Sequence, residues 1–402
     1  MASVKPFRNP SGDIVWRVQY RDHGKSRQET FRGDEAEESA HEFADLMERF
    51  DVKTAREVLA RRTATTSASP TLREFTERYL DEQSGLVTGI TVRTRIDYIR
   101  VAKSFLPLLG DLPIDTITKA DIGRWVAWQE AQPARYGTGR VAAKTVKNHH
   151  ALLSAILRAA VDQGLRPDNP AARAKLSRGI HREGVFLSSE EFDTLLRFIP
   201  DEHRPLVVFL AGTGCRWGEA TALRWGDLNT KATPPTVRIE RAWKRTGHGA
   251  VELGPPKSPK SRRTVSLPPE VLAELPERGK PADLIFTAPR GGMVWHGRFN
   301  ADVWRPAVAA ANDVERCAEL GVQPIGKEPN IHDLRHTHAS WLIAGGAPLP
   351  FVQARLGHEK IDTTVGTYGH LLPDAHVEMA RIIGGAMQLS PKRALEASQA
   401  RS

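Results

Sequence analysis

The first part of the chain carries two hydrophobic patterns in succession. Between residues 14 and 21 apolar and polar side chains alternate in the string I-V-W-R-V-Q-Y-R, which predicts a strand. A second strand is expected over 26–31, after a turn around Gly24. Residues 35–50 then repeat apolar positions at helical spacing. Residues 1–60 are therefore predicted to form a module made of a hairpin and a helix.

A helical period dominates the next part of the chain, over residues 71–176. Thr118 and Asp121 have the spacing of an N-terminal capping box, and a helix over 144–163 is expected to end at Gly164. This part is predicted to be a small helical domain. Its first two apolar stripes, which are expected to face a core, follow Leu72, Phe75, Tyr79, Val92, Ile96, Ile99 and Phe105.

The pattern becomes mixed beyond a polar break. Helical stretches rich in Leu and Ala come first, short alternating segments at 236–239 and 263–267 predict strands, and more helices follow. The predicted fold is therefore multidomain, mainly α with small β elements. The expected divisions are a module at 1–60, a linker at 61–70, a helical domain at 71–176, a linker at 177–184, a mixed α/β domain at 185–390, and a C-terminal tail at 391–402 that is expected to be disordered.

Composition narrows the class of partner and the compartment. The 402 residues suffice for two or three domains, and the net charge of +9 favours a polyanionic partner. The two cysteines, Cys215 and Cys317, form no C-x-x-C pair, so a disulfide framework or a cysteine-rich zinc site is not expected. The first residues lack an apolar signal core, and no run reaches the roughly 18 apolar residues of a membrane span. We therefore expect a soluble cytoplasmic protein with no membrane partner.

Six side chains in the second half of the chain share one chemistry. They lie in the strings G-T-G-C-R-W-G-E, P-P-K-S-P-K-S-R-R, I-H-D-L-R-H-T-H and L-G-H-E-K-I-D-T-T-V-G-T-Y. The set offers a hydroxyl nucleophile, fixed positive charge for a phosphate and a proton source for a leaving oxygen, which is what phosphoryl transfer without a metal requires. Its members are Arg216, Lys257, His332, Arg335, His358 and Tyr368.

In order, spacing and flanking residues this set resembles the tyrosine recombinase (phage integrase) family, whose pattern is Arg, Lys, His-x-x-Arg, His and Tyr. The resemblance spans roughly residues 70–375. It implies a helical core-binding domain and a mixed α/β catalytic domain of the tyrosine recombinase type. The N-terminal hairpin and helix resemble the arm-type DNA-binding module of phage integrases. The predicted function is therefore a site-specific recombinase that integrates or excises a mobile element.

The resemblance also implies how the phosphate is attacked and held. Tyr368 would attack a DNA phosphate and form a 3′-phosphotyrosyl link, and two rounds of exchange would pass through a Holliday junction. Arg216 and Arg335 would hold the non-bridging oxygens, helped by His358. Glu219, one turn after Arg216, would orient that arginine.

Proton transfer and DNA contacts are implied in the same way. His332 would assist proton transfer at the tyrosine, and Lys257 would protonate the leaving 5′ oxygen. Lys260 competes for the role of Lys257 and is otherwise expected to contact a phosphate. Further cations that lie off the apolar stripes of the helical domain would contact DNA phosphates, or else simply face solvent: Arg93, Arg95, Lys103, Arg140, Lys144 and Lys147.

The resemblance implies partners but no cofactor. The expected partners are double-stranded DNA, at core sites and at arm sites, three further copies of the chain in a homotetramer, and an accessory DNA-bending or directionality protein. Because the phosphotyrosyl link retains the energy of the phosphodiester, no ATP, cofactor or metal is expected.

Several alternatives remain open on the sequence alone. His332-x-x-x-His336 mimics a zinc-binding helix, but this interpretation supplies no clear third ligand and leaves Arg216 and Tyr368 unexplained. A chromosome or plasmid dimer resolvase would share the catalytic set but lack the arm-like module. A type IB topoisomerase would share the tyrosine chemistry. A non-catalytic DNA-binding regulator would leave Tyr368 and Lys257 without a role.

Overall fold

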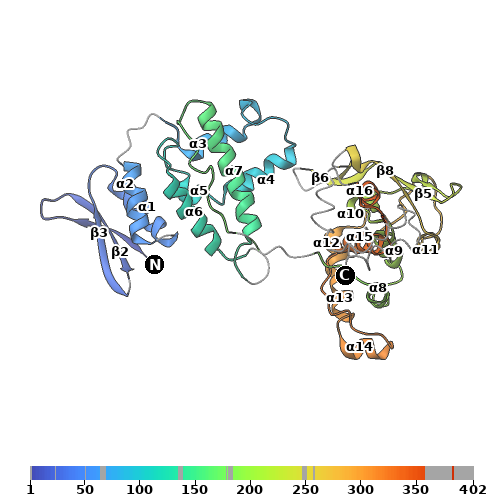
Figure 1. Cartoon of the computed structure of the whole chain (residues 1–402). Coiled ribbons are helices and arrows are strands. Elements are labelled where there is room, and N and C mark those ends of the chain that lie inside the picture. Colours follow the sequence, from blue (N-terminus) through green and yellow to red (C-terminus); the bar gives the residue numbers. More distant parts are fainter. Residues whose placement is uncertain are drawn as a thin grey trace, which may run out of the picture. The chain divides into compact units, whose positions relative to one another are not determined.

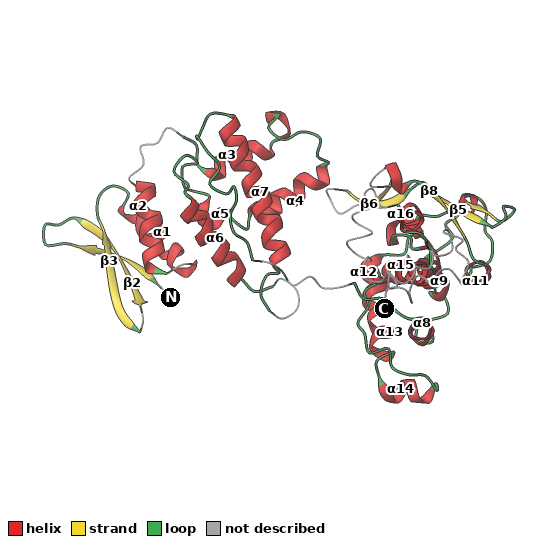
Figure 2. Cartoon of the chain, in the orientation of Figure 1, coloured by secondary structure: helices red, strands yellow, loops and turns green. Residues whose placement is uncertain are grey.

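A computed structural model describes residues 2–22, 24–49, 51–63, 69–134, 139–177, 179, 184–246, 251–256, 259–357 and 383. The chain divides into two compact units, Met1–Ile180 and His181–Ser402. The described residues are mainly helical with small antiparallel sheets, which confirms the predicted fold class (Figure 1 and Figure 2). None of the described helices combines the length and the hydropathy that crossing a membrane requires.

The first unit begins with an antiparallel sheet of strand order β1-β2-β3, on which one helix packs and a second helix packs in turn. Val18, Tyr20 and Phe43 are buried between sheet and helix. The predicted hairpin and its following helix are confirmed, whereas the strongly exposed first strand has no alternating pattern that would predict it. The elements are β1 (Ser3–Arg8), β2 (Ile14–Asp22), β3 (Lys25–Phe31), α1 (Ala36–Arg49) and α2 (Val52–Thr63).

The rest of this unit is a helical cluster in which the long helix α7 packs against α3, α4 and α6. The capping box predicted at Thr118 and Asp121 is confirmed, and Gly164 follows the end of α7 with a positive φ of 73°. Trp125 is fully buried, and its indole N–H donates to the carbonyl of Ser104 at 2.9 Å. The elements are α3 (Leu72–Leu80), η1 (Glu82–Ser84), α4 (Val92–Ala102), α5 (Leu106–Leu109), α6 (Lys119–Ala131) and α7 (Ala143–Asp162).

The two parts of the first unit share one hydrophobic cluster, which includes Leu59 of α2 and Phe75 of α3. Arg124 of α6 also forms an ion pair with Glu57 of α2. The helix α2 continues through 61–63, where a linker is predicted, and part of the linkers and the whole C-terminal tail lie outside the described residues. The domain boundaries therefore stay predictions.

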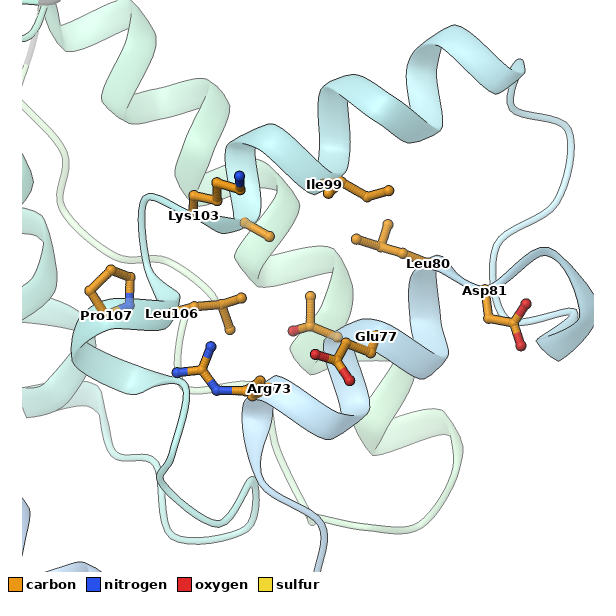
Figure 3. Close-up of a pocket in the computed structure, with 10 residues that line it drawn as sticks. Arg73, Glu77, Leu80, Asp81, Ile99, Lys103, Leu106 and Pro107 are labelled. Atoms are coloured by element: carbon orange, nitrogen blue, oxygen red, sulfur yellow. The ribbon is translucent and has the colours of Figure 1, made fainter. Parts of the chain in front are cut away.

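The helix α4 departs from its predicted burial. Val92 and Ile99 are 58% and 47% exposed, so the prediction that they face a core is wrong. Ile99 instead lines an open cavity of about 540 Å³ between α3, α4 and α5, near Leu80 and with Lys103 at the margin (Figure 3). A helical period identifies an apolar face but not whether another element covers it.

In the second unit α9 is buried on most sides and packs against α15, α10 and α11. The predicted strands at 236–239 and 263–267 are confirmed as β5 and β8, in a sheet of order β4-β5-β8 beside the separate hairpin β6-β7. The elements are α8 (Ser189–Leu196), α9 (Arg204–Thr213), α10 (Trp217–Ala220), η2 (Trp225–Asp227), β4 (Leu228–Asn229), β5 (Thr236–Ile239), β6 (Ala242–Arg245), β7 (Val251–Gly254), η3 (Pro259–Ser261), β8 (Arg263–Ser266), α11 (Pro269–Ala273), α12 (His296–Phe299), η4 (Asn300–Trp304), α13 (Arg305–Ala310), α14 (Val314–Glu319), α15 (Asp333–Ala344) and α16 (Leu349–Leu356).

Candidate active site

Arg216 follows a tight turn at the end of α9. Gly214 makes this turn with a φ of 65°, a conformation that L side chains rarely adopt. A Cβ at Gly214 would lie 2.6 Å from the His338 ring and 2.8 Å from Leu356, so a side chain has no room there. The helix α10 then begins with Arg216 as its N-cap residue.

Glu219 contacts both the side chain and the main chain of Arg216. Nη1 of Arg216 donates to Oε1 of Glu219 at 2.8 Å, and the main-chain N–H of Arg216 donates to Oε2 at 3.0 Å. The Glu219 side chain is 3% exposed and that of Arg216 is 36% exposed. A buried carboxylate thus lies behind a guanidinium that reaches the surface. The pairing predicted from the sequence is present, while the orienting role stays a prediction.

A second arginine contacts the same carboxylate. Nη2 of Arg263 donates to Oε2 of Glu219 at 3.0 Å. Burial by itself raises the pKa of Glu219, but the charges and hydrogen bonds of Arg263 and Arg216 outweigh it and lower the pKa below its usual value. Glu219 is therefore ionised at neutral pH.

Arg335 is held between two chain segments. It lies in α15, is buried, and donates from Nη1 to the carbonyl of Gly214 and from Nη2 to the carbonyl of Leu356, both at 2.6 Å. The first carbonyl belongs to the turn before Arg216, and the second to the end of α16. The guanidinium plane is thereby fixed against both segments.

His332, the N-cap residue of α15, lies close to both arginines. Partial burial of its ring, its electrostatic interaction with His336, and the positive charges of Arg335 and Arg216 lower the pKa of His332 to about 4, although the residue as a whole is exposed. His332 is therefore neutral at physiological pH and able to accept a proton. The structure brings Arg216, His332 and Arg335 together.

The other three candidates, Lys257, His358 and Tyr368, lie outside the described residues. Their neighbours in sequence are described. Lys260 is exposed in η3, and its carbonyl would lie 3.1 Å from a Cβ placed on Gly357. The segments that adjoin Lys257 and His358 in the chain are therefore in contact.

The partly buried Arg355 and the buried His338 form a hydrogen-bond network next to these groups. Nε of Arg355 donates to Nε2 of His338 at 2.8 Å, and its other nitrogens donate to Ser266 Oγ and to the carbonyls of Ser266 and Gly212. Since Nε2 of His338 accepts, the proton is on Nδ1, which lies 2.7 Å from the carbonyl of Ala211. Burial, and then the charge of Arg355, lower the pKa of His338 to about 3. His338 is thus a neutral imidazole with both nitrogens bonded.

The sequence predicts no role in this assembly for Arg355, Arg263 or His338. His338 has one signal, its position three residues after Arg335, which places both on one helix face. Arg263 shares a strand face with the buried Val265, two positions on. Arg355 has no comparable signal.

The cations predicted to contact DNA differ in their surroundings. Arg93 pairs with Asp97 at 3.1 Å, and Nη1 of Arg95 donates to the carbonyl of Leu80 at 2.6 Å, so both have partners within their own unit. The exposed members of the predicted set are Lys103, Arg140, Lys144 and Lys147.

The zinc interpretation gains no ligand set from the described part of the chain. Nε2 of His336 is 4.0 Å from Oδ1 of Asp333, and the rings of His332 and His336 are 5.4 Å apart. No group of three His, Cys, Asp or Glu side chains suited to a metal ion occurs among the residues that are described.

The chain is similar in sequence to phage integrases. Residues 185–374 match the sequence model of the phage integrase family. The integrase of Mycobacterium phage FRAT1 is 28% identical over 297 residues, which cover 72% of this chain and 80% of that protein.

Solved structures share the fold. The Tn1549 transposon integrase in complex with a circular intermediate DNA has a TM-score of 0.63 and 19% identity, over 78% of this chain and all of that chain. The lambda integrase tetramer bound to a Holliday junction has a TM-score of 0.51 and 20% identity, over 88% of this chain and 95% of that one.

The neutral state of His338 predicts how stability depends on pH. Its pKa is lower in the folded than in the unfolded chain, so its stabilising contribution is complete above the unfolded value of about 6.5 and decreases as the pH falls toward 3. Between pH 7 and pH 5 this histidine should account for up to about 2 kcal/mol of lost unfolding free energy. Urea denaturation of the wild-type protein and of His338→Gln at pH 7 and pH 5 measures this loss of unfolding free energy. Equal losses in the two proteins would contradict the assignment.

Proposed function

Because the chain belongs to the phage integrase family and is a tyrosine-type site-specific recombinase, we propose that it integrates or excises a mobile DNA element through a 3′-phosphotyrosyl intermediate. This proposal rests mainly on the grouping of Arg216, Arg335 and His332. Glu219 fixes Arg216, the carbonyl of Gly214 fixes Arg335, and the histidine beside them is neutral. A phosphate bound there would meet preorganised positive charge. Such charge stabilises a phosphoryl-transfer transition state without a reorganisation cost.

Tyr368 is the proposed nucleophile. Its phenolic oxygen forms a bond to a DNA phosphorus, the bond from that phosphorus to the 5′ oxygen breaks, and the phosphate stays on the 3′ end. The phenol has an ordinary pKa near 10, so its proton must be removed as it attacks. His332 is neutral at the lowered pKa of about 4 and so has a ring nitrogen free to accept this proton, and the negative charge of a bound phosphate would raise its basicity.

The leaving oxygen needs a proton, which we assign to Lys257. Arg216, Arg335 and His358 are assigned to the non-bridging oxygens. Arg216 suits this role because its guanidinium is partly exposed while Glu219 fixes its position. In the reverse reaction the 5′ hydroxyl of a partner strand attacks the phosphotyrosine, and the tyrosine leaves. Bond energy is conserved throughout, so the reaction needs no nucleotide.

The proposed assembly is a homotetramer on two DNA duplexes, because the two rounds of exchange together cleave four strands and each chain contributes one Tyr368. The similarity to a lambda integrase that forms a tetramer on a Holliday junction supports it. The sheet β1-β2-β3 with its helices is assigned to arm-type sites and the helical cluster after it to core sites. An accessory DNA-bending or directionality protein is a further expected partner. The reaction would take place on the chromosome, in the cytoplasm of a bacterial host.

Replacing the nucleophile tests the reaction class. Tyr368→Phe removes one oxygen atom, so binding of the recombination site should stay within a few-fold while cleavage is lost. Gel-shift titration measures the first and adduct formation on a nicked suicide substrate measures the second. A covalent adduct formed by Tyr368→Phe would show that another residue attacks the DNA.

Lys257 and Lys260, which follow β7 in the chain, are distinguished by a sulfur substitution. Lys257→Ala should cleave roughly 10²–10⁴-fold more slowly, because proton donation is lost. Replacing the leaving 5′ oxygen by sulfur should largely restore the rate, since a thiolate leaves without a proton. Lys260→Ala should instead weaken binding in a salt-dependent way, as a phosphate contact would. If the sulfur substrate restored the cleavage rate of Lys260→Ala but not that of Lys257→Ala, Lys260 would be the proton donor and Lys257 the phosphate contact.

Removal of metals tests the source of the positive charge. Cleavage and rejoining should proceed at an unchanged rate in excess EDTA, because the side chains of Arg216, Arg335 and Lys257 supply the charge that a metal supplies elsewhere. Single-turnover rates with and without EDTA measure it. Loss of cleavage that Zn²⁺ or Mg²⁺ restores would favour a metal-dependent site at His332 and His336.

A further inference from the structure

Arg263, the first residue of β8, donates hydrogen bonds to η3, which directly precedes it in the chain, and to two distant segments. Nε donates to the carbonyl of Arg355 at 2.6 Å, Nη1 to the carbonyl of Ser261 at 3.0 Å, and Nη2 to Oε2 of Glu219 at 3.0 Å. The side chain is 7% exposed, so these bonds lie largely out of water. Each nitrogen of the guanidinium therefore has a defined partner.

The three segments are those that lead to proposed catalytic residues. Glu219 holds Arg216. Ser261 ends η3, which begins two residues after Lys257. Arg355 precedes His358 by three residues in the last turn of α16. A single planar side chain thus connects parts of the chain that are up to 136 positions apart, from Glu219 to Arg355.

Charge gives Arg263 a second effect. Glu219 is a buried carboxylate, and two guanidiniums share it. Within this trio one positive charge remains uncompensated, and Arg216 is the member that reaches the surface. Without Arg263, the carboxylate would neutralise Arg216 alone, and the attraction between Arg216 and an incoming phosphate would weaken.

We propose that Arg263 is a positioning residue for strand cleavage, which sets Arg216 through Glu219 and sets the approach to His358 through the end of α16. Arg263 does not contact DNA in this role, because its donors point to groups of its own chain. Lysine would not replace it, since an ammonium on a flexible stem cannot present three fixed donors in diverging directions. This proposal rests on the proposed function.

The test compares Arg263→Lys with Arg262→Lys, the same substitution at the exposed neighbouring arginine. Two quantities are measured: the Kd for a core-site duplex, and the single-turnover rate constant for adduct formation on a nicked suicide substrate. Arg263→Lys should keep the Kd within threefold and cleave roughly 10²-fold more slowly, the loss expected when catalytic groups are displaced by about 1 Å. Arg262→Lys should leave the cleavage rate within threefold. Unfolded protein lowers the amplitude of the reaction but not its rate constant, so a loss of stability alone would not imitate the effect.

Two further readouts separate positioning from a purely structural role. A sulfur leaving group should not restore the Arg263→Lys rate, because the defect concerns the non-bridging oxygens. In the double variant with Glu219→Gln and Arg263→Lys, the cleavage rate should fall by much less than the product of the two single-variant fold-losses, because both residues act on Arg216. If Arg263→Lys does not fold, Arg263→Gln provides the same comparisons, because it keeps an amide donor and removes the charge.

The outcomes are distinct. Wild-type cleavage together with an Arg263→Lys rate within threefold of it would overturn this proposal alone. The proposal would also be overturned if a sulfur leaving group restored the Arg263→Lys cleavage rate. The same holds if the fold-losses of Arg263→Lys and Glu219→Gln multiplied in the double variant. Failure of the wild-type protein to form any adduct would overturn the proposed function and this proposal with it.

Discussion

The buried carboxylate of Glu219 is the constraint on which the candidate site depends. An ionised carboxylate out of water costs several kcal/mol unless it is paired and hydrogen-bonded. Glu219 meets this requirement with the main-chain N–H of Arg216 and with the guanidiniums of Arg216 and Arg263. Removing one partner of such a pair typically costs about 3–5 kcal/mol, so the positions of the two arginines are tied to the stability of the unit. The geometry that a bound phosphate would encounter is a consequence of satisfying this one charge.

Close packing between α9 and α15 adds a second constraint. The turn at Gly214 must approach His338 and Leu356 more closely than a Cβ would permit, and its carbonyl then lies within 2.6 Å of Arg335. Arg335 therefore spans from this turn to the end of α16 because the backbone comes close enough. Behind it, Arg355 and the neutral His338 join α16 to the same end of α9. The arginines are held by the packing of the helices, before any DNA is present.

The sequence predicts the local features well and the network poorly. The features that are predicted correctly depend on neighbours within a few residues. They are the strands β2, β5 and β8, the capping box at Thr118 and the pairing of Arg216 with Glu219. Val92 and Ile99 were expected in a core and are exposed, because a period does not tell which faces another helix will cover. Arg263 and Arg355 are absent from the prediction because most of their partners are distant in the sequence. Glu219 and Arg355 are 44 and 92 positions from Arg263, and Ser266 and Gly212 are 89 and 143 positions from Arg355.

The kind of acceptor explains why the hydrogen-bond partners of the arginines in this network are hard to find in a sequence. Arg335 and Arg263 donate mainly to carbonyls, those of Gly214, Leu356, Arg355 and Ser261. Every residue type supplies a carbonyl, so an acceptor position imposes no requirement on its own side chain. Gly214 is the exception, since its φ and its surroundings exclude a side chain. The information that builds this network therefore lies in the donors and in glycines such as Gly214, and it can be recognised as a site only when the backbone has brought the carbonyls together.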